Sequence, residues 1–201
     1  MSEPENFAFT PENLERAKAR IAKYPAGRQA SAVLALLDLA QRQNGGWLSR
    51  AAMDYVAHML GMAPIRVYEA GTFYTMFHLR PVGRHLLQAC TTTPCWLRGS
   101  SDVVAACERK LGIGLGETTA DGLFTLIEVE CLGACVNAPI LQVNDDYYED
   151  LDGPATEALI DALKKGEPPP PGSVIGRRGS EPVGGATTLH EVAAPATGEE
   201  A

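Results

Sequence analysis

The sequence predicts a protein of mixed α and β structure, in the α+β or α/β class, with a helical N-terminal part followed by a domain built on a mixed sheet. Two observations predict it. Over residues 1–80 apolar side chains recur about every 3.6 residues, which indicates amphipathic helices. From Gly83 onward, short apolar runs alternate with helical segments. We divide the chain into residues 1–80, 81–166 and a tail at 167–201.

The helical part contains clear start and stop signals. Thr10-Pro11-Glu12 supplies a capping hydroxyl, a proline in the first turn and an acid that favours the helix N-terminus. A second helix over 31–43 carries a broad leucine-rich face, and Asn44-Gly45-Gly46 ends it. Ser49 can cap a third helix that ends at Gly61, and a short helix is expected over 64–70.

The second part begins with two strands that each lead into a cysteine. Residues 85–89 form an apolar run that ends at Cys90, and residues 124–130 form another that ends at Cys131. Between them, residues 101–111 have a helical pattern, and we expect Ser100 or Ser101 to cap that helix.

A hairpin and a closing helix complete the predicted domain. The runs 140–143 and 147–151 flank Asn144-Asp145-Asp146, which is typical turn chemistry, and an amphipathic helix is expected over 155–165. The acidic residues here lack the spacing of a calcium loop, so we expect a solvated hairpin. They are Asp145, Asp146, Glu149, Asp150 and Asp152.

Composition and charge exclude several classes of protein. A net charge of −8 argues against binding to nucleic acid, which needs a basic face. No apolar run approaches the ~20 residues of a membrane span, so direct membrane insertion is not expected. The segment 1–9 lacks the basic and apolar regions of a signal peptide, which favours a cytoplasmic protein in which disulfides are uncommon. With five cysteines, one would stay unpaired in any case.

Four of the cysteines form two close pairs, each directly after a predicted strand. Cys90 and Cys95 have C-x4-C spacing, and Cys131 and Cys135 have C-x3-C spacing. If the two strands are neighbours, their C-terminal ends bring all four sulfurs together. We favour an iron–sulfur site over zinc, although spacing alone does not exclude zinc. Cys107, in the middle of a helix, is expected to pack in the core.

Longer motifs around these cysteines resemble one family. Cys90-Thr-Thr-Thr-Pro-Cys-Trp-Leu-Arg-Gly-Ser100 and Val129-Glu-Cys-Leu-Gly-Ala-Cys-Val-Asn-Ala-Pro139 closely resemble the thioredoxin-like 2Fe-2S subunit of respiratory complex I. Segments 72–77, 116–119 and 143–149 also fit. The resemblance implies an N-terminal helical bundle and a thioredoxin-like 2Fe-2S ferredoxin domain. It also implies that Cys90, Cys95, Cys131 and Cys135 ligate one 2Fe-2S cluster.

The function implied by this resemblance is electron transfer within NADH:quinone oxidoreductase. A flavoprotein partner would bind NADH and FMN, and the cluster would exchange an electron with the FMN. The protein would be bacterial and cytoplasmic, peripheral to the inner membrane through further complex I subunits. Gly112-Ile-Gly-Leu-Gly116 follows a helix, so it fails as a dinucleotide fingerprint. We therefore assign no catalytic residue and expect no NADH oxidation by the isolated chain.

Two alternatives stay open at this point. The chain could be the equivalent diaphorase subunit of an NAD-linked hydrogenase or formate dehydrogenase, or a zinc-stabilised scaffold protein.

The tail is rich in Pro and Gly and cannot build a core of its own. We expect an extended or disordered segment in which residues 168–180 bind the partner subunit, Arg177 and Arg178 included, and residues 187–201 have no role.

Overall fold

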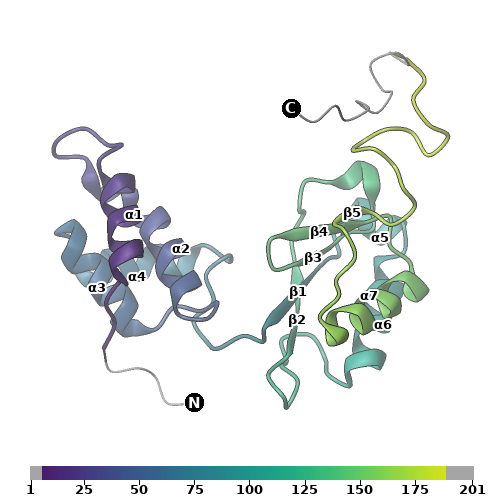
Figure 1. The fold of residues 1–201 in the computed structure, drawn as a ribbon, viewed down its shortest axis with the longest axis horizontal. Coiled ribbons are helices and arrows are strands. Elements are labelled where there is room, and N and C mark those ends of the chain that lie inside the picture. The colour runs from purple at the N-terminus through teal and green to yellow at the C-terminus, as the bar shows by residue number, and fades with distance from the viewer. Residues whose placement is uncertain (1–5, 189–201) are drawn as a thin grey trace, which may run out of the picture. The chain divides into compact units, whose positions relative to one another are not determined.

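The structure is a computed structural model that describes residues 6–188. The chain divides into two compact units, one extending to Arg84 and the other beginning at His85 (Figure 1). The first unit contains only helices among its described residues, and the second contains the sheet. This confirms the predicted fold class of N-terminal helices followed by a mixed sheet.

The first unit begins with α1 (Pro11–Ile21) and α2 (Val33–Gln43). Thr10 caps α1 as predicted, since its hydroxyl accepts a hydrogen bond of 3.3 Å from the Asn13 N–H. The 3-10 helix η1 (Gln29–Ala32) leads directly into α2. The predicted second helix therefore starts two residues later as an α-helix than its apolar pattern suggested.

Helices α3 (Arg50–Leu60) and α4 (Pro64–Phe73) complete this unit. The Ser49 hydroxyl accepts from the Ala52 N–H at 3.2 Å and so caps α3. Gly61 ends α3 in the left-handed conformation at φ 61°, which glycine adopts without steric cost. Both signals were predicted from the sequence and are confirmed.

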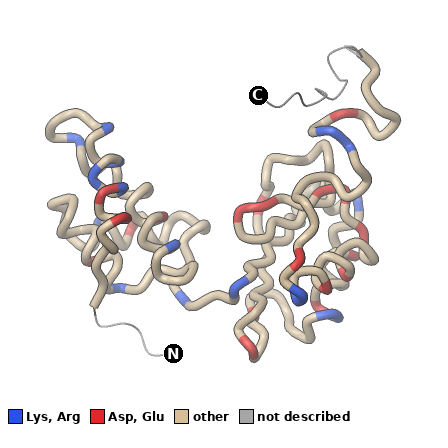
Figure 2. The backbone as a smooth tube through the Cα atoms, viewed as in Figure 1, with Lys and Arg blue, Asp and Glu red and all other residues tan. Residues whose placement is uncertain are grey.

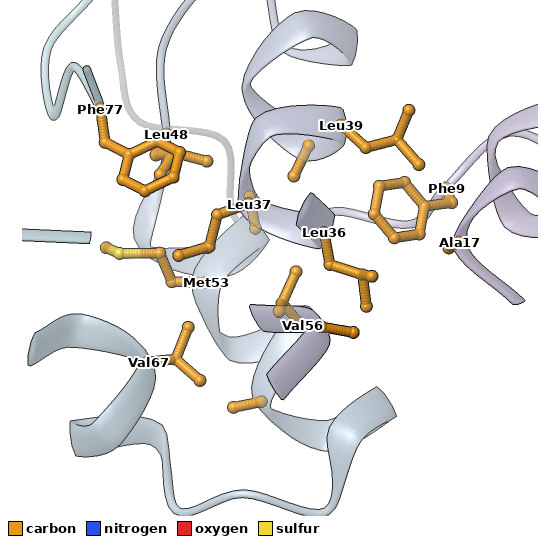
Figure 3. Close-up of a cluster of buried hydrophobic side chains, with 14 residues drawn as sticks. Phe9, Ala17, Leu36, Leu37, Leu39, Leu48, Met53, Val56, Val67 and Phe77 are labelled. Carbon is orange, nitrogen blue, oxygen red and sulfur yellow. The ribbon is translucent and has the colours of Figure 1, made fainter. Parts of the chain in front are cut away.

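The helices of this unit pack around one apolar core. Leu36 and Leu37 of α2 face Val56 of α3, and all three are fully buried (Figure 3). Gly71 lets α4 approach α3 closely, because a Cβ at this position would lie 2.9 Å from the Met53 sulfur. The packing of the four α-helices on one core is the bundle that the sequence implied.

The second unit contains a five-stranded sheet in the order β2-β1-β3-β4-β5. Strands β1 and β2 are parallel, β3 is antiparallel to both β1 and β4, and β5 is parallel to β4. The strands are β1 (His85–Cys90), β2 (Phe124–Val129), β3 (Leu141–Val143), β4 (Asp146–Glu149) and β5 (Gly172–Ser173).

The parallel strands β1 and β2 are joined by two helices, α5 (Thr93–Leu97) and α6 (Ser100–Leu111). The predicted serine cap of α6 is wrong. Gly99 is the N-cap, with φ 99°, and no side chain caps the helix. Ser100 is buried and is the first residue of the helix, so it occupies the position after the N-cap and does not cap the helix.

Helix α7 (Gly153–Lys165) packs beside α6 on the sheet (Figure 1). Its cap is Asp152, whose carboxylate accepts from the Ala155 N–H at 2.8 Å. Alternate residues of β1, such as Leu87 and Ala89, join the core under these helices, as the two-residue period of a strand requires. Ile160 of α7 and Val103 of α6 meet them there.

The two units carry opposite net charge. Among the described residues, the first unit has ten Lys and Arg against five Asp and Glu, whereas the second has seven Lys and Arg against fifteen Asp and Glu. Figure 2 shows where these residues lie along the backbone. None of the helices within residues 6–188 has the length and apolar character needed to span a bilayer.

We expect Leu87→Ala to lower the free energy of unfolding by about 2–5 kcal/mol, because it leaves a cavity in the centre of the sheet core. The matched control is Leu115→Ala, at a side chain that is 41% exposed, and it should change stability by less than about 0.5 kcal/mol. Denaturant titration of both variants measures the difference. Equal losses would contradict the placement of Leu87 in the core.

Candidate metal centre

Cys90 and Cys95 lie at the C-terminal end of β1. Cys90 is the last residue of the strand, and its N–H donates to the Ile140 carbonyl at 3.2 Å. Cys95 follows on α5, whose first turn forms as the Trp96 N–H bonds to the Thr92 carbonyl at 2.9 Å. Both cysteines are 1% exposed, so this pair is the buried side of the site.

Cys131 and Cys135 lie on the loop after β2. Gly133, at φ 80°, turns the loop so that its N–H donates to the Cys131 sulfur at 3.4 Å. Cys135 begins the 3-10 helix η2 (Cys135–Asn137), and its sulfur lies 3.3 Å from that of Cys131. Cys131 is exposed and Cys135 is half-buried, so this pair is the open side of the site.

The sheet register brings the two pairs to one edge. Cys90 is paired with Val129 across β1 and β2, and Cys131 follows Val129 by two residues. Because these strands are parallel, their C-terminal ends lie side by side. The condition for convergence of the four cysteines, that the two strands are neighbours, is met.

The thiols of the open pair differ in acidity. A hydrogen bond from the Gly133 N–H, and then one from Cys135, lowers the pKa of Cys131. The pKa of Cys135 is raised, first by its hydrogen bond to Cys131 and then by burial. One thiol of this pair is therefore favoured as the thiolate, which is the form that ligates metal.

In the buried pair, too, the pKa of one thiol is lowered and that of the other is raised. Burial alone would raise the pKa of Cys90, but hydrogen bonds from the Thr92 hydroxyl, the Leu132 backbone and Cys95 together lower it. The Cys90 sulfur lies 3.3 Å from the Thr92 oxygen. Burial, followed by the contact with Cys90, raises the pKa of Cys95 to about 12.

The two pairs also act on each other. A charge on Cys135 raises the pKa of Cys95, and a charge on Cys90 opposes ionisation of Cys131. The four sulfurs thus share one electrostatic neighbourhood, which a bound cation would stabilise.

The donor set fits a binuclear cluster. Within the part of the chain that the structure describes, no three His, Cys, Asp or Glu side chains converge on a single ion. The four thiols instead form two pairs, and a 2Fe-2S cluster takes four cysteines, two on each iron. The residues present therefore supply the four thiol ligands that such a cluster takes.

The loop that carries the open pair is held from the hairpin. The Tyr147 hydroxyl donates to the Leu132 carbonyl at 2.9 Å. Asn137, which is buried, donates through its side-chain nitrogen to Glu149 at 2.6 Å, and its carbonyl accepts from the Asp150 N–H at 2.7 Å. Residues of β4 and the turn after it therefore support both halves of the loop.

The expectation of a solvated acidic hairpin is wrong for Asp150. Its side chain is only 4% exposed, and it forms a 2.8 Å ion pair with Arg177, whose side chain is 7% exposed. No local pattern in the sequence indicates this pair, because Arg177 lies in the Pro- and Gly-rich tail. The Arg177 side chain is therefore engaged within its own domain. The expected binding of residues 168–180 to the partner subunit stays a prediction. Residues 189–201, which include most of the segment expected to have no role, lie outside the described chain.

Cys107 stands apart from the four. It is fully buried in the core formed by α6, α7 and the sheet, and burial, with a smaller contribution from Glu108, raises its pKa to about 12. A protonated thiol in an apolar core is a packing residue.

Exposed apolar side chains directly follow one cysteine of each pair. Trp96 and Leu97 follow Cys95 and are 62% and 71% exposed, and Val136 follows Cys135 and is 65% exposed. We call Trp96, Leu97 and Val136 the apolar rim. Large apolar side chains exposed beside a functional site are typical of protein interfaces.

Sequence comparison assigns the chain to a family. Residues 17–164 match the family model described as thioredoxin-like [2Fe-2S] ferredoxin, and the chain belongs to this family of iron–sulfur proteins. This confirms the resemblance found from the motifs.

Two relatives carry more specific names. A component of the NADH-quinone oxidoreductase of Rickettsia bellii is 60% identical over 159 residues, which is 79% of this chain and 95% of the relative. The mitochondrial NADH dehydrogenase [ubiquinone] flavoprotein 2 of Dictyostelium discoideum is 52% identical over 185 residues, 92% of this chain and 75% of that protein.

Among solved structures, an NAD+-reducing [NiFe]-hydrogenase in the air-oxidized state contains a similar fold. The TM-score is 0.59 at 21% identity, over 68% of this chain and 23% of the hydrogenase chain. At this identity the similarity concerns the fold alone.

Proposed function

We propose that this chain is the electron-carrying subunit of NADH:quinone oxidoreductase, and that Cys90, Cys95, Cys131 and Cys135 hold one 2Fe-2S cluster. The observation that carries the proposal is the convergence of two cysteine pairs at the end of two parallel strands. The names of relatives that are 52% and 60% identical support the same function.

In this proposal Cys90 and Cys95 hold one iron, and Cys131 and Cys135 hold the other. The bound cluster supplies a centre that accepts and releases one electron at a time. The protein's own part is to hold the thiolates and to direct donors at their sulfurs, as Thr92 and Gly133 do. Such hydrogen bonds are among the features that set the potential of a cluster.

The partner in this proposal is the flavoprotein subunit that binds NADH and FMN. Electron transfer requires the cluster to lie near the flavin, and the open side of the site is where the chain can be approached. The apolar rim suits that face, since large apolar residues form the buried centre of interfaces. With further complex I subunits, the chain would lie in the cytoplasm of a bacterium, peripheral to the inner membrane.

The division into a helical bundle at 1–80, a 2Fe-2S domain at 81–166 and a tail at 167–201 fits this role, with the cluster confined to the second part.

The alternative function is the equivalent diaphorase subunit of an NAD-linked hydrogenase or formate dehydrogenase. The fold shared with an NAD+-reducing hydrogenase is compatible with this alternative. Isolation of the native complex discriminates the two, since only one of them contains quinone-binding membrane subunits.

We expect Cys131→Ala to abolish the 2Fe-2S cluster, because it removes one ligand of the open pair. Cys107→Ala is the matched control and should leave the visible spectrum and the iron and sulfide content unchanged. Iron and sulfide analysis of the two purified variants checks the assignment. A chain that lost iron through Cys107→Ala but kept it through Cys131→Ala would contradict the ligand set.

The purified chain alone should not oxidise NADH with ferricyanide as acceptor. Its glycine-rich segment 112–116 follows α6 and leads to β2 alongside the sheet, so it does not form the strand-to-helix turn that cradles a pyrophosphate. Absorbance at the NADH band is the measurement, with the flavoprotein-containing complex as the positive control. Steady NADH oxidation by the chain alone would contradict the proposal that the partner subunit oxidises NADH and this chain only carries electrons.

Val136→Glu should weaken binding to the flavoprotein subunit by roughly tenfold or more, because it places a charge in the centre of the proposed interface. Leu115→Glu, at another exposed apolar residue in the connection after α6, is the control and should bind as the unchanged chain does. Affinity is measured by titration with the purified flavoprotein subunit, after the cluster content of each variant has been verified. Equal affinities would reject the apolar rim as the docking face.

A further inference from the structure

Arg177 connects the C-terminal tail to the loop of the open cysteine pair. Its Nη2 atom donates to the Val136 carbonyl at 2.9 Å and to the Asn137 side-chain oxygen. These are the two residues that follow Cys135 in η2. The same guanidinium group binds Asp150 through Nη2 at 2.8 Å and through Nε at 3.0 Å.

The tail is folded around this arginine. The β5 pairing with β4 fixes the chain on one side of it, and the Ser173 hydroxyl donates to Asp150 at 2.7 Å and accepts from the Arg177 N–H at 3.3 Å. On the other side, Arg177 Nη1 donates to the Glu181 carbonyl at 2.9 Å. The Gly179 carbonyl in the tail also accepts a hydrogen bond of 2.7 Å from the Asn137 side-chain nitrogen.

We propose that Arg177 is a positioning residue for the cluster, and that residues 172–181 form a clasp that holds η2, and with it Cys135, in its ligating position. The inference rests on the proposed function, because it assigns the clasp a role only if Cys135 ligates iron.

The chemistry of the contacts supports this role. A guanidinium group has several donors fixed in one plane. Here they reach the Asp150 carboxylate, two acceptors in η2 and the Glu181 carbonyl in the tail. The side chains of both partners of the ion pair are more than nine-tenths buried, so water does not readily replace these bonds. Lysine cannot reproduce the pattern, because its ammonium group is a single point charge.

The position of the clasp completes the support of the ligand loop. Tyr147 holds the first half of the loop at Leu132, between the two cysteines. Arg177 holds the segment immediately after the second cysteine. The loop is otherwise on the open side of the site, so groups that restrain it act as outer-shell supports, which tune the retention of a metal centre.

The test compares full-length Arg177→Lys with the unchanged chain and with Arg178→Lys, a matched control at the exposed neighbouring arginine. Each is loaded with its 2Fe-2S cluster, and the loss of the visible absorbance to a chelator is followed. We expect Arg177→Lys to lose its cluster about tenfold faster, with an altered visible circular dichroism spectrum. Loss at the unchanged rate with an unchanged spectrum overturns the proposal.

Arg177→Lys retains a charge opposite Asp150, so it separates the positioning role from neutralisation of a buried carboxylate. If neutralisation were the whole role, this variant would behave as the unchanged chain does, which is the overturning result. A second measurement does not depend on the cluster. Hydrogen exchange of the metal-free full chain should be faster at residues 135–138 in Arg177→Lys than in Arg178→Lys, and equal exchange overturns the clasp.

The two measurements separate the proposals. If the unchanged chain held no 2Fe-2S cluster, the proposed function would fail, while the exchange experiment would still decide whether the clasp restrains η2.

Discussion

The parallel pairing of β1 with β2 is the constraint on which the candidate centre depends. It places the ends of two strands that are far apart in the sequence next to each other, with Cys90 on one and Cys131 just beyond the other. Parallel strands need a crossover connection, and here α5 and α6 provide it. Because Cys95 lies on α5, the same connection that makes the pairing possible also supplies a ligand candidate.

The rest of the domain stabilises that pairing from two directions. On one face, α6 and α7 cover the apolar residues of the strands. At the end of the sheet, the hairpin of β3 and β4 and the clasp at residues 172–181 restrain the loop after β2. The loop itself needs Gly133 in a left-handed conformation to direct an N–H group at sulfur. The ligand candidates are thus held by groups from most elements of the domain.

Much of this architecture was predictable because its signals are local. The caps at Thr10 and Ser49, the stop at Gly61 and the strands that end at the cysteines each depend on a few adjacent residues. The cysteine pairs were found by spacing for the same reason. Gly99 displaced the predicted serine cap because a glycine at positive φ let α6 begin one residue earlier. The Arg177–Asp150 pair joins segments 27 residues apart, and no period or motif relates them.

The unequal burial of the two cysteine pairs gives the centre a direction. Cys90 and Cys95 are buried, whereas Cys131 is exposed and Cys135 is half-buried. If these cysteines hold a cluster as proposed, oxidants and chelators would reach it from the side of Cys131 and Cys135. A partner that covers this side would shield the centre as well as exchange electrons with it, so that assembly and protection against oxygen become a single event.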